Sequence, residues 1–431
     1  MIEIKTTKER IESQGGLLLL GSLAKLMKLH EVRSWEKRPT GAIITQLFGM
    51  FAQGETSFEA SRQFRGNDFA KEILGLPKIY SPETIRIYLE SMCDIPESVE
   101  KLMAQLQACS NRLLAKAEIT PIKTKKNTYI PYDFDTSPLD NGNTKKENIG
   151  YTYKGFFGYQ PMFGYYGGEG YMALCELRPG NQHCQKGTPE FIRRAIEALP
   201  PSAKGKNILF RFDSGNDSID TVKSVLKEPL VPGTLVPGLD ETRHEMGKTT
   251  PYSIIKRNLR KEDPDWWLTT AKTDGAHTIP HKGINRYVGK IELDNAVCNQ
   301  YPDVYVVFEV IEHCVDSDGT KQLFPKIEVN TFWTNLDEDA ETVIELYHDH
   351  ATMEQFHSEL KTDMGVERLP SGKYGVNQVL FSIAMCAFNA LRFIGQTAIG
   401  KKELLPIKPR AGTIRKRIGT VIRDIIHFAG K

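Results

Sequence analysis

The sequence predicts an α/β fold, in which a mixed sheet with a β-rich insertion is flanked by helical N- and C-terminal regions. Up to about residue 115, apolar residues recur at three- and four-residue spacing, which is typical of helices. Between about residues 127 and 228, the pattern gives three strands, a helix, a strand and a helix. This order is typical of a sheet that contains both parallel and antiparallel strands.

Length and composition bound the number of domains. The chain has 431 residues, 40% of them hydrophobic and 26% charged, which is near the average of globular proteins and excludes wholesale disorder. At roughly 150 residues per domain, we expect two or three cooperative units. The pattern gives a helical region, a first part of the sheet domain, a β-rich insertion, a second part of the sheet domain and a basic helical C-terminal region. Their expected ranges are residues 1–115, 116–229, 230–325, 326–375 and 376–431.

The N-terminal region is expected to be a helical bundle. One helix begins clearly, with Ser81 as N-cap, Pro82 at the first helical position and Glu83 in the first turn. It exposes Arg86 and follows a shorter helix at residues 57–64 across a loop longer than that of a tight helix-turn-helix. A helix that reads DNA and an ordinary bundle helix are therefore both open. The longer expected helices cover residues 17–29, 43–53, 85–95 and 99–117.

The later elements follow from alternation and from turn residues. The first set of expected strands covers residues 127–137, 158–166, 170–180 and 207–213, with helices at residues 189–201 and 218–228. Short strands are then expected at residues 252–259, 266–272, 286–293, 304–314 and 326–336, followed by a long helix from about residue 338 to 363.

Neither end of the chain nor its apolar segments indicate a membrane protein. Residues 1–16 lack the pattern of a secretory signal, so we expect a cytoplasmic chain. The most apolar run, residues 379–395, contains Asn389 and Arg392 and is shorter than the ~20 residues of a membrane span. We interpret it as a buried helix and expect no membrane partner.

Overall charge does not indicate a nucleic-acid partner, because 56 Lys plus Arg and 54 Asp plus Glu give a net charge of only +2. Charge is distributed unevenly, however. Basic residues greatly outnumber acidic ones from residue 401 to 431, where Arg415, Lys416 and Arg417 are consecutive. Such a segment attracts phosphate, and a solvated basic helix is the alternative that charge alone leaves open.

Two expected strands carry acidic residues. Asp133 and Asp135 are two apart on one strand, so both project from the same face. Asp213 ends another strand, at the edge where α/β sheets gather ligands. Asp133 could be the ligand itself or a partner that supports the ligand, and we favour Asp135 as the ligand because Thr136 and Ser137 follow it.

The long helix offers a third carboxylate. At about 100° per residue, spacings of 3, 7 and 14 return almost to one face of a helix. Four polar residues share an arc of roughly 60° by this geometry: Tyr347, His350, Glu354 and Lys361. Glu359, at about 120° from Tyr347, points away, so the geometry selects Glu354. An apolar stripe should face the core: Leu346, Met353, Phe356, Leu360 and Met364.

Three carboxylates in one place suit phosphodiester cleavage and transfer. Mg²⁺ or Mn²⁺ prefers carboxylate oxygens, and two ions about 3.5 to 4 Å apart can activate the attacking oxygen and stabilise the leaving one. Tyr347, His350 and Lys361 would add a hydroxyl, an imidazole and a cation to hold a phosphate. Each acid by itself is more often a solvated surface residue, and it is the shared helix face that favours a site.

The spacing of Tyr347, His350, Glu354 and Lys361 resembles the Y-x-x-R-x-x-x-E-x-x-x-x-x-x-K signature of bacterial insertion-sequence transposases. These enzymes have a DDE triad on a ribonuclease-H-like fold. One residue departs from the signature, since His350 stands where Arg is usual. Arg grips phosphate at any pH, whereas His does so strongly only when protonated.

Two further segments carry the same resemblance. FDTSPLDNG around Asp135 resembles the first acidic strand of the family, and RFDSG around Asp213 resembles the second. The order of acidic residues and β-rich insertion also agrees over about residues 128–374. The resemblance implies that Asp135, Asp213 and Glu354 are catalytic and bind two Mg²⁺ or Mn²⁺ ions, with Asp133 as the alternative ligand. Tyr347, His350 and Lys361 would then contact DNA phosphates.

The resemblance also implies partners. The substrate would be double-stranded DNA at the terminal inverted repeats of an insertion sequence, moved by cut-and-paste transposition, with a homodimer formed on DNA. We expect residues 1–115 to bind the DNA end, with further contacts from Arg86, Arg415, Lys416, Arg417 and Trp333. Two alternatives are a metal-dependent endonuclease of the same fold and an inactive DNA-binding regulator.

Tryptophans within and just after the insertion have a separate expected role. Some relatives form a DNA hairpin and hold a flipped base with aromatic residues of the insertion, for which Trp266, Trp267 and Trp333 are candidates. We favour core packing for each of the three.

Overall fold

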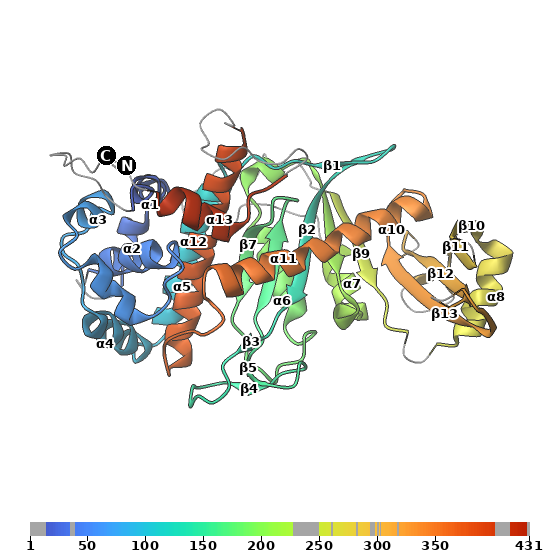
Figure 1. The fold of residues 1–431 in the computed structure, drawn as a ribbon, viewed down its shortest axis with the longest axis horizontal. Coiled ribbons are helices and arrows are strands. Elements are labelled where there is room, and N and C mark those ends of the chain that lie inside the picture. Colours follow the sequence, from blue (N-terminus) through green and yellow to red (C-terminus); the bar gives the residue numbers. More distant parts are fainter. Residues whose placement is uncertain are drawn as a thin grey trace, which may run out of the picture.

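The computed structural model describes residues 14–34, 39–226, 250–259, 262–281, 283–293, 298–299, 301, 303–316, 319–400 and 414–428. In these residues a ten-stranded sheet runs through the molecule, with the N-terminal helices at one end (Figure 1). The central strands are β1 Ile122–Lys123, β2 Thr128–Thr136, β6 Met162–Tyr166, β7 Tyr171–Glu176, β8 Asn207–Phe212 and β9 Thr250–Lys256. The remaining strands of the sheet are β10 Ala276–His281, β11 Ile284–Ile291, β12 Tyr305–Val315 and β13 Lys321–Thr334.

The centre of the sheet has the order β7-β6-β2-β8-β9. Strands β2, β8 and β9 are parallel, whereas β6 and β7 are antiparallel to their neighbours. This mixed sheet confirms the predicted fold class. Helices α6 Thr188–Glu197 and α7 Ile219–Leu226 connect the strands as predicted, while the expected strand at residues 158–166 is divided at Pro161 because proline cannot donate to a strand ladder.

The alternation in β2 and β8 decides which side chains face the core. Phe134 and Phe212 stack at 4.7 Å between ring centroids on one face, and both are fully buried. Asp133, Asp135 and Arg211 therefore project from the other face. The parallel register pairs Phe134 with Phe212, so residues 135 and 213 follow side by side.

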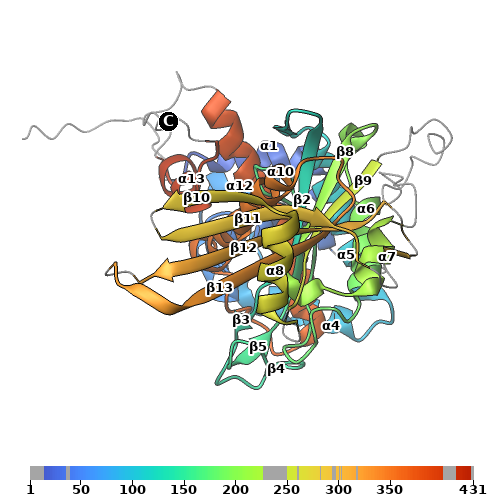
Figure 2. The same ribbon diagram turned by 90° about the vertical axis from the view of Figure 1, so that its right-hand side faces the viewer.

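The insertion extends the same sheet. Strands β10 to β13 form an antiparallel meander that joins the centre through β13 and β9, and α8 Pro264–Asp274 lies across it (Figure 2). The prediction of a strand at residues 266–272 was wrong, since these residues belong to α8. The Asp263 carboxylate caps this helix by accepting from the Asp265 amide, and Pro264 occupies the first turn. Two short antiparallel pairings form a separate sheet of β3 Leu139–Asp140, β4 Gly150–Tyr151 and β5 Phe157–Tyr159.

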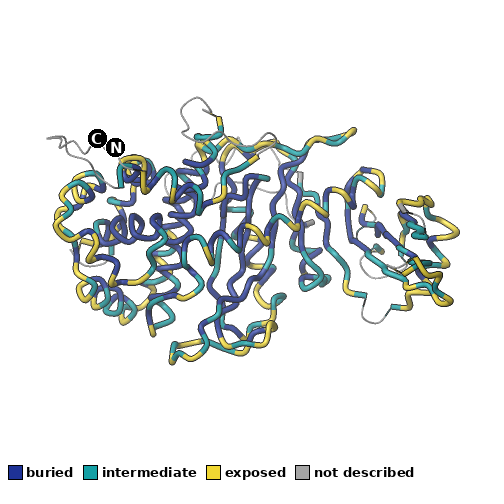
Figure 3. The backbone as a smooth tube through the Cα atoms, in the orientation of Figure 1, coloured by how far each residue is buried: buried dark blue, intermediate teal, exposed yellow. Residues whose placement is uncertain are grey.

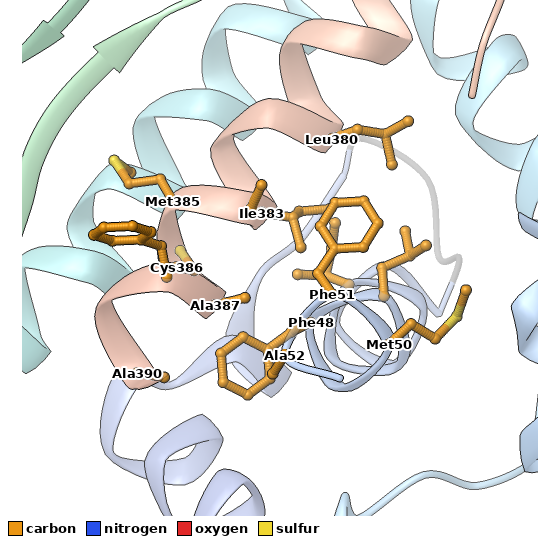
Figure 4. Packing of buried hydrophobic residues seen from close by; sticks show 14 of the residues in the cluster. Phe48, Met50, Phe51, Ala52, Leu380, Ile383, Met385, Cys386, Ala387 and Ala390 are labelled. Carbon is orange, nitrogen blue, oxygen red and sulfur yellow. The ribbon is translucent and has the colours of Figure 1, made fainter. Parts of the chain in front are cut away.

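The N-terminal helices share one core with α12 Tyr374–Gly400. In Figure 4, Phe48 and Phe51 of α2 lie beside α12. Ser81 caps α4 by accepting from the Thr84 amide, with Pro82 in the first turn, as predicted. This core joins the first and last of the predicted regions, whose boundaries stay predictions. The other helices here are α1 Leu17–Met27, α2 Thr40–Phe51, α3 Asp68–Ile73, α4 Pro82–Cys93, α5 Ser98–Leu114 and α13 Ile418–Val421, with 3₁₀ turns at Leu29–Glu31 and Phe58–Phe64.

Helix α12 is 27 residues long, longer than the apolar run suggested. By length and composition it is able to cross a membrane, but 89% of its most apolar window is buried inside the protein. Figure 3 shows buried backbone in the sheet centre and inside the helical end of the molecule. The interpretation of this segment as a buried helix is confirmed.

The expected long helix runs from residue 340 to 363 across the face of the sheet (Figure 1). It consists of α10 Ala340–His348, a 3₁₀ turn at Asp349–Thr352, α11 Met353–Ser358 and a π turn at Glu359–Asp363. The predicted apolar stripe is buried throughout: Leu346, Met353, Phe356, Leu360 and Met364. Its packing holds the opposite, polar part of the helix over β2. This part carries Tyr347, His350, Glu354 and Lys361 and is called the polar stripe below.

Candidate active site

Asp135 and Asp213 lie side by side at the carboxyl ends of two parallel strands. Asp135 is the second-last residue of β2, and Asp213 directly follows β8. The Thr136 amide donates to Asp135 Oδ1 at 2.7 Å, and Asn216 Nδ2 donates to Asp213 Oδ1 at 2.7 Å. The Asp135 side chain is 25% exposed, so the pair is accessible from solvent.

The electrostatics of this pair favour a bound cation. Burial, and then the negative charge of Asp135, raise the pKa of Asp213. Within the described residues, neither carboxylate forms a salt bridge with a lysine or arginine, and His357 is the basic residue in contact. Two neighbouring carboxylates without a cationic side chain fit a hard divalent ion such as Mg²⁺.

Asp133 occupies a closed environment instead. It is 2% exposed, and Arg211 donates to both its oxygens at 2.6 and 2.7 Å. His350 Nδ1 lies 2.8 Å from Asp133 Oδ1, and Arg211 also donates to the Leu346 carbonyl oxygen at 2.6 Å. Burial by itself would raise the pKa of Asp133, but Arg211 and His350 outweigh it and hold the pKa below its ordinary value. This environment favours Asp135 over Asp133 as a ligand.

The polar stripe of the long helix follows β2 from one aspartate to the next. His350 contacts Asp133, as described above, and its ring lies 5.4 Å from that of Tyr347. Burial, followed by the charges of Asp213 and Asp135, raises the pKa of Tyr347. Tyr347 thus lies near enough for the charges of the acidic pair to act on it, while the direct contact of His350 is with Asp133. Their expected contacts with phosphate stay predictions.

Lys361, at the other end of the stripe, donates from Nζ to the Pro138 carbonyl oxygen at 2.6 Å. Pro138 is three residues after Asp135, so the amine lies near the pair. Burial lowers the pKa of Lys361, and the nearby charge of Lys154 adds to the effect, while Glu367 opposes it.

Glu354 is the one member of the expected triad that the structure does not bring to the pair. Its side chain is exposed, and the described residues contain no group of three His, Cys, Asp or Glu side chains able to hold a metal. It does lie one helical turn from both His350 and His357, which contact the two aspartates of β2.

His357 contacts the pair and was missed from the sequence. Its Nε2 lies 3.3 Å from Asp135 Oδ2, and its Nδ1 lies 3.4 Å from the Tyr165 hydroxyl oxygen. The ring is 5% exposed and packs on Phe163 at 4.8 Å between centroids. His357 is seven residues after His350, so the spacing that selected the other members of the stripe contained the signal.

Glu359, which the geometry excluded, has a different role. It is 3% exposed and forms a buried ion pair with Arg392 of α12. The Arg392 guanidinium also lies over the rings of Phe356 and Phe388, at 5.5 and 5.3 Å from their centroids. Glu359 therefore points away from the site, as predicted, but into the interface with α12.

Arg86 and Trp333, which were expected to contact DNA, have partners inside the protein. Arg86 pairs with Glu83 and Glu90 on its own helix at 2.5 and 3.0 Å. Trp333 is 7% exposed and donates to Asp217 at 3.1 Å, and Trp267 is 1% exposed, so core packing describes both tryptophans. Trp266 is 48% exposed, so the core packing expected for this residue was wrong. The proposed DNA contacts of these residues stay predictions.

The described part of the basic C-terminal segment packs against the helix that carries Glu354. Arg415 contacts Gln355 and lies over the Phe356 ring at 4.7 Å. Arg417 donates to both oxygens of Asp363 at 2.8 and 2.9 Å. Lys416 lies between them and accepts a hydrogen bond from Arg392 through its carbonyl oxygen. The segment thus places Arg415 next to the turn of the helix that carries Glu354, while the charge of Arg417 is paired with Asp363.

Residues 90–230 match a family model described as transposase DDE domain group 1, and this stretch contains Asp135 and Asp213. The match confirms the predicted resemblance for that part of the chain. No curated protein matches the sequence. Among solved structures, the chain is similar to a piggyBac transposase in a synaptic complex with hairpin DNA. The identity is 11% and the TM-score 0.46, with 95% of this chain and 79% of that chain covered.

Proposed function

We propose that the chain, which carries a transposase DDE domain within residues 90–230, cuts and rejoins double-stranded DNA at the terminal inverted repeats of an insertion sequence. The observation that carries this proposal is the pair of Asp135 and Asp213, side by side at the ends of β2 and β8. A pair of partly buried carboxylates that forms no salt bridge with a lysine or arginine of the described residues suits divalent-metal phosphoryl transfer.

Asp135, Asp213 and Glu354 would hold two Mg²⁺ or Mn²⁺ ions. Two observations support this donor set, namely the raised pKa of Asp213 beside Asp135 and the position of Glu354 one turn from His357. When bound, such ions polarise the scissile phosphate and favour loss of the proton from the attacking hydroxyl. Glu354 would turn toward the pair, because added positive charge removes the repulsion between the carboxylates.

Three residues of the same stripe would position the DNA. Lys361 and Tyr347 offer an ammonium and a hydroxyl group to phosphate oxygens on either side of Glu354. At His350, Asp133 occupies Nδ1, which leaves Nε2 as the ring nitrogen for a phosphate oxygen. Arg211 and Asp133 would fix the orientation of this ring and of the helix above β2.

The test is cleavage by the purified chain of a duplex that spans one end of the element and its flanking DNA. We expect nicking at the junction in Mg²⁺ and none in EDTA. The Asp213→Asn variant should not nick the duplex, and Asp220→Asn serves as its matched control. Asp220 is an exposed acidic residue on α7, outside the pair, so its variant should cut normally. An Asp213→Asn variant that cuts as the wild type does would overturn the proposal.

The two alternatives predict other outcomes of the same experiment. An endonuclease of this fold would cut shuffled DNA as fast as the end sequence. An inactive regulator would bind the end and leave it intact in both Mg²⁺ and Mn²⁺. Light scattering with and without the end duplex tests the proposed homodimer, which should form when DNA is added.

A further inference from the structure

The turn that connects β4 and β5 is fixed by its own backbone. Thr152, which is 2% exposed, donates from its amide and its hydroxyl to the Phe156 carbonyl oxygen, both at 2.9 Å. The Gly155 amide donates back to the Thr152 carbonyl oxygen at 3.0 Å, with a φ of 85° that favours glycine. An ordered turn presents its side chains with little entropy left to lose on binding.

This turn, residues 151–157, exposes three aromatic rings and is called the aromatic turn below. Tyr151, Tyr153 and Phe157 are 61%, 64% and 54% exposed, and the rings of Tyr151 and Phe157 meet edge to face at 5.4 Å. They are half of the large aromatic residues exposed in the described part of the chain, the others being Trp266, Phe324 and Phe428. Grouped exposed apolar rings usually mark a binding surface.

The aromatic turn lies beside the acidic pair. The Tyr153 hydroxyl donates to the carbonyl oxygen of Thr136, the residue after Asp135, at 3.5 Å. Burial of this hydroxyl, and then the charges of Asp135 and Asp213, raise the pKa of Tyr153. The Tyr153 ring is therefore exposed on one side while its hydroxyl faces the candidate site.

The turn also carries positive charge. Lys154 is exposed, and its Nζ lies 5.9 Å from the centroid of the Tyr153 ring. Its charge acts on Lys361, the residue proposed to hold a phosphate. Aromatic faces next to lysines are the combination with which proteins bind single-stranded nucleic acid.

We propose that the aromatic turn stacks on unpaired bases of the DNA strand whose backbone lies at Asp135 and Asp213. This inference rests on the proposed function and adds a base-contacting surface outside the insertion. The backbone would lie along Lys154 and Lys361, and the bases next to the cut would leave the duplex to meet Tyr153, Tyr151 and Phe157. Stacking on a π face requires no particular base, so the contact would not depend on sequence.

A second copy of the chain fits this surface less well. Lysine is depleted in the cores of protein interfaces, and Lys154 is at the tip of the turn between the aromatic residues. A second copy bound to the aromatic turn would also have to leave Asp135 and Asp213 open to substrate. A DNA strand fits the turn better, because its phosphate would lie beside Lys154 and its bases would stack on the aromatic rings.

The test uses a DNA duplex with a short unpaired end that carries 2-aminopurine, whose fluorescence falls when it stacks on an aromatic ring. The full chain with Asp213→Asn serves as the background, so that binding is measured without cleavage. Tyr153→Leu and Phe157→Leu remove a ring from the turn, Tyr153→Phe keeps the ring, and Phe324→Leu removes an exposed ring elsewhere. Fully paired duplex of the same sequence is the control ligand.

We expect each leucine variant in the turn to lose the quenching and to bind the unpaired probe about tenfold more weakly. Tyr153→Phe and Phe324→Leu should bind as the background does, and the paired duplex should bind equally to all variants. Wild-type quenching in the leucine variants would overturn the inference, as would a change in their oligomeric state without DNA. Failure of the wild-type chain to cut in Mg²⁺ overturns the proposed function instead, because the stacking measurement does not require cleavage.

Discussion

Replacement of Asp133 by alanine should lower the stability of the fold far more than replacement of Asp135, because Asp133 stabilises the fold and Asp135 belongs to the candidate site. The change would leave the Arg211 guanidinium, 2% exposed, with the Leu346 carbonyl oxygen and without its bidentate partner. Removal of one member of a buried ion pair costs about 3–5 kcal/mol. Asp135→Ala removes a partly exposed carboxylate that repels Asp213, so its cost should stay below about 1 kcal/mol.

Urea unfolding in EDTA at neutral pH measures both effects. We expect a clear decrease in the unfolding midpoint for Asp133→Ala and little change for Asp135→Ala, whereas cleavage should be lost in Asp135→Ala. The double variant Asp133→Ala, Arg211→Met should recover much of the lost stability, because no buried charge is then left without a partner. Equal midpoints for Asp133→Ala and the wild type, or no recovery in the double variant, would refute this assignment of Asp133 to the fold.

Four further predictions follow from the charges at and around the site. The folded chain raises the pKa of Asp213, so the associated stability is fully present below the ordinary value of 3.8 and is lost as pH rises through the folded pKa. Asp213→Asn should therefore raise the melting temperature in EDTA at neutral pH, with the difference vanishing in acid. Glu359→Ala should cost about 3–5 kcal/mol because it leaves Arg392 buried without its partner, while Glu354→Ala should keep the unfolding midpoint and lose cleavage. Lys361→Met should weaken DNA binding and reduce the slope of log affinity against log salt by about 1, measured by fluorescence anisotropy.

Much of the fold could be predicted because local patterns and packing agree. The alternation around Asp135 and Asp213 predicted two strands with their acidic residues at the same edge, and the structure places them in parallel register. The segment at residues 266–272 was misread because Trp and Thr favour strands, whereas the Asp263 cap and Pro264 start a helix there. Local propensity yields to capping at such positions.

The partners of the acidic residues were harder to predict. Arg211 pairs with Asp133 through the register between β2 and β8, which a single sequence does not encode at residue level. His357 was within reach of the helical spacing, but a histidine so close to the apolar stripe is usually a core residue. Tyr153 lies in a turn without periodicity, and only the folding of β4 and β5 into a separate sheet near the end of β2 brings it to the site.

The most direct measurement is metal-dependent cleavage at the junction between the element end and its flanking DNA, by the wild type and by Asp135→Asn, Asp213→Asn and Glu354→Gln. We expect the wild type to release a 3′-hydroxyl at the junction in Mg²⁺ or Mn²⁺, and each variant to lose this activity by several orders of magnitude while it still binds the DNA end. Cleavage that persists in EDTA, or in any of the three variants at the wild-type rate, would contradict a metal site built from these carboxylates.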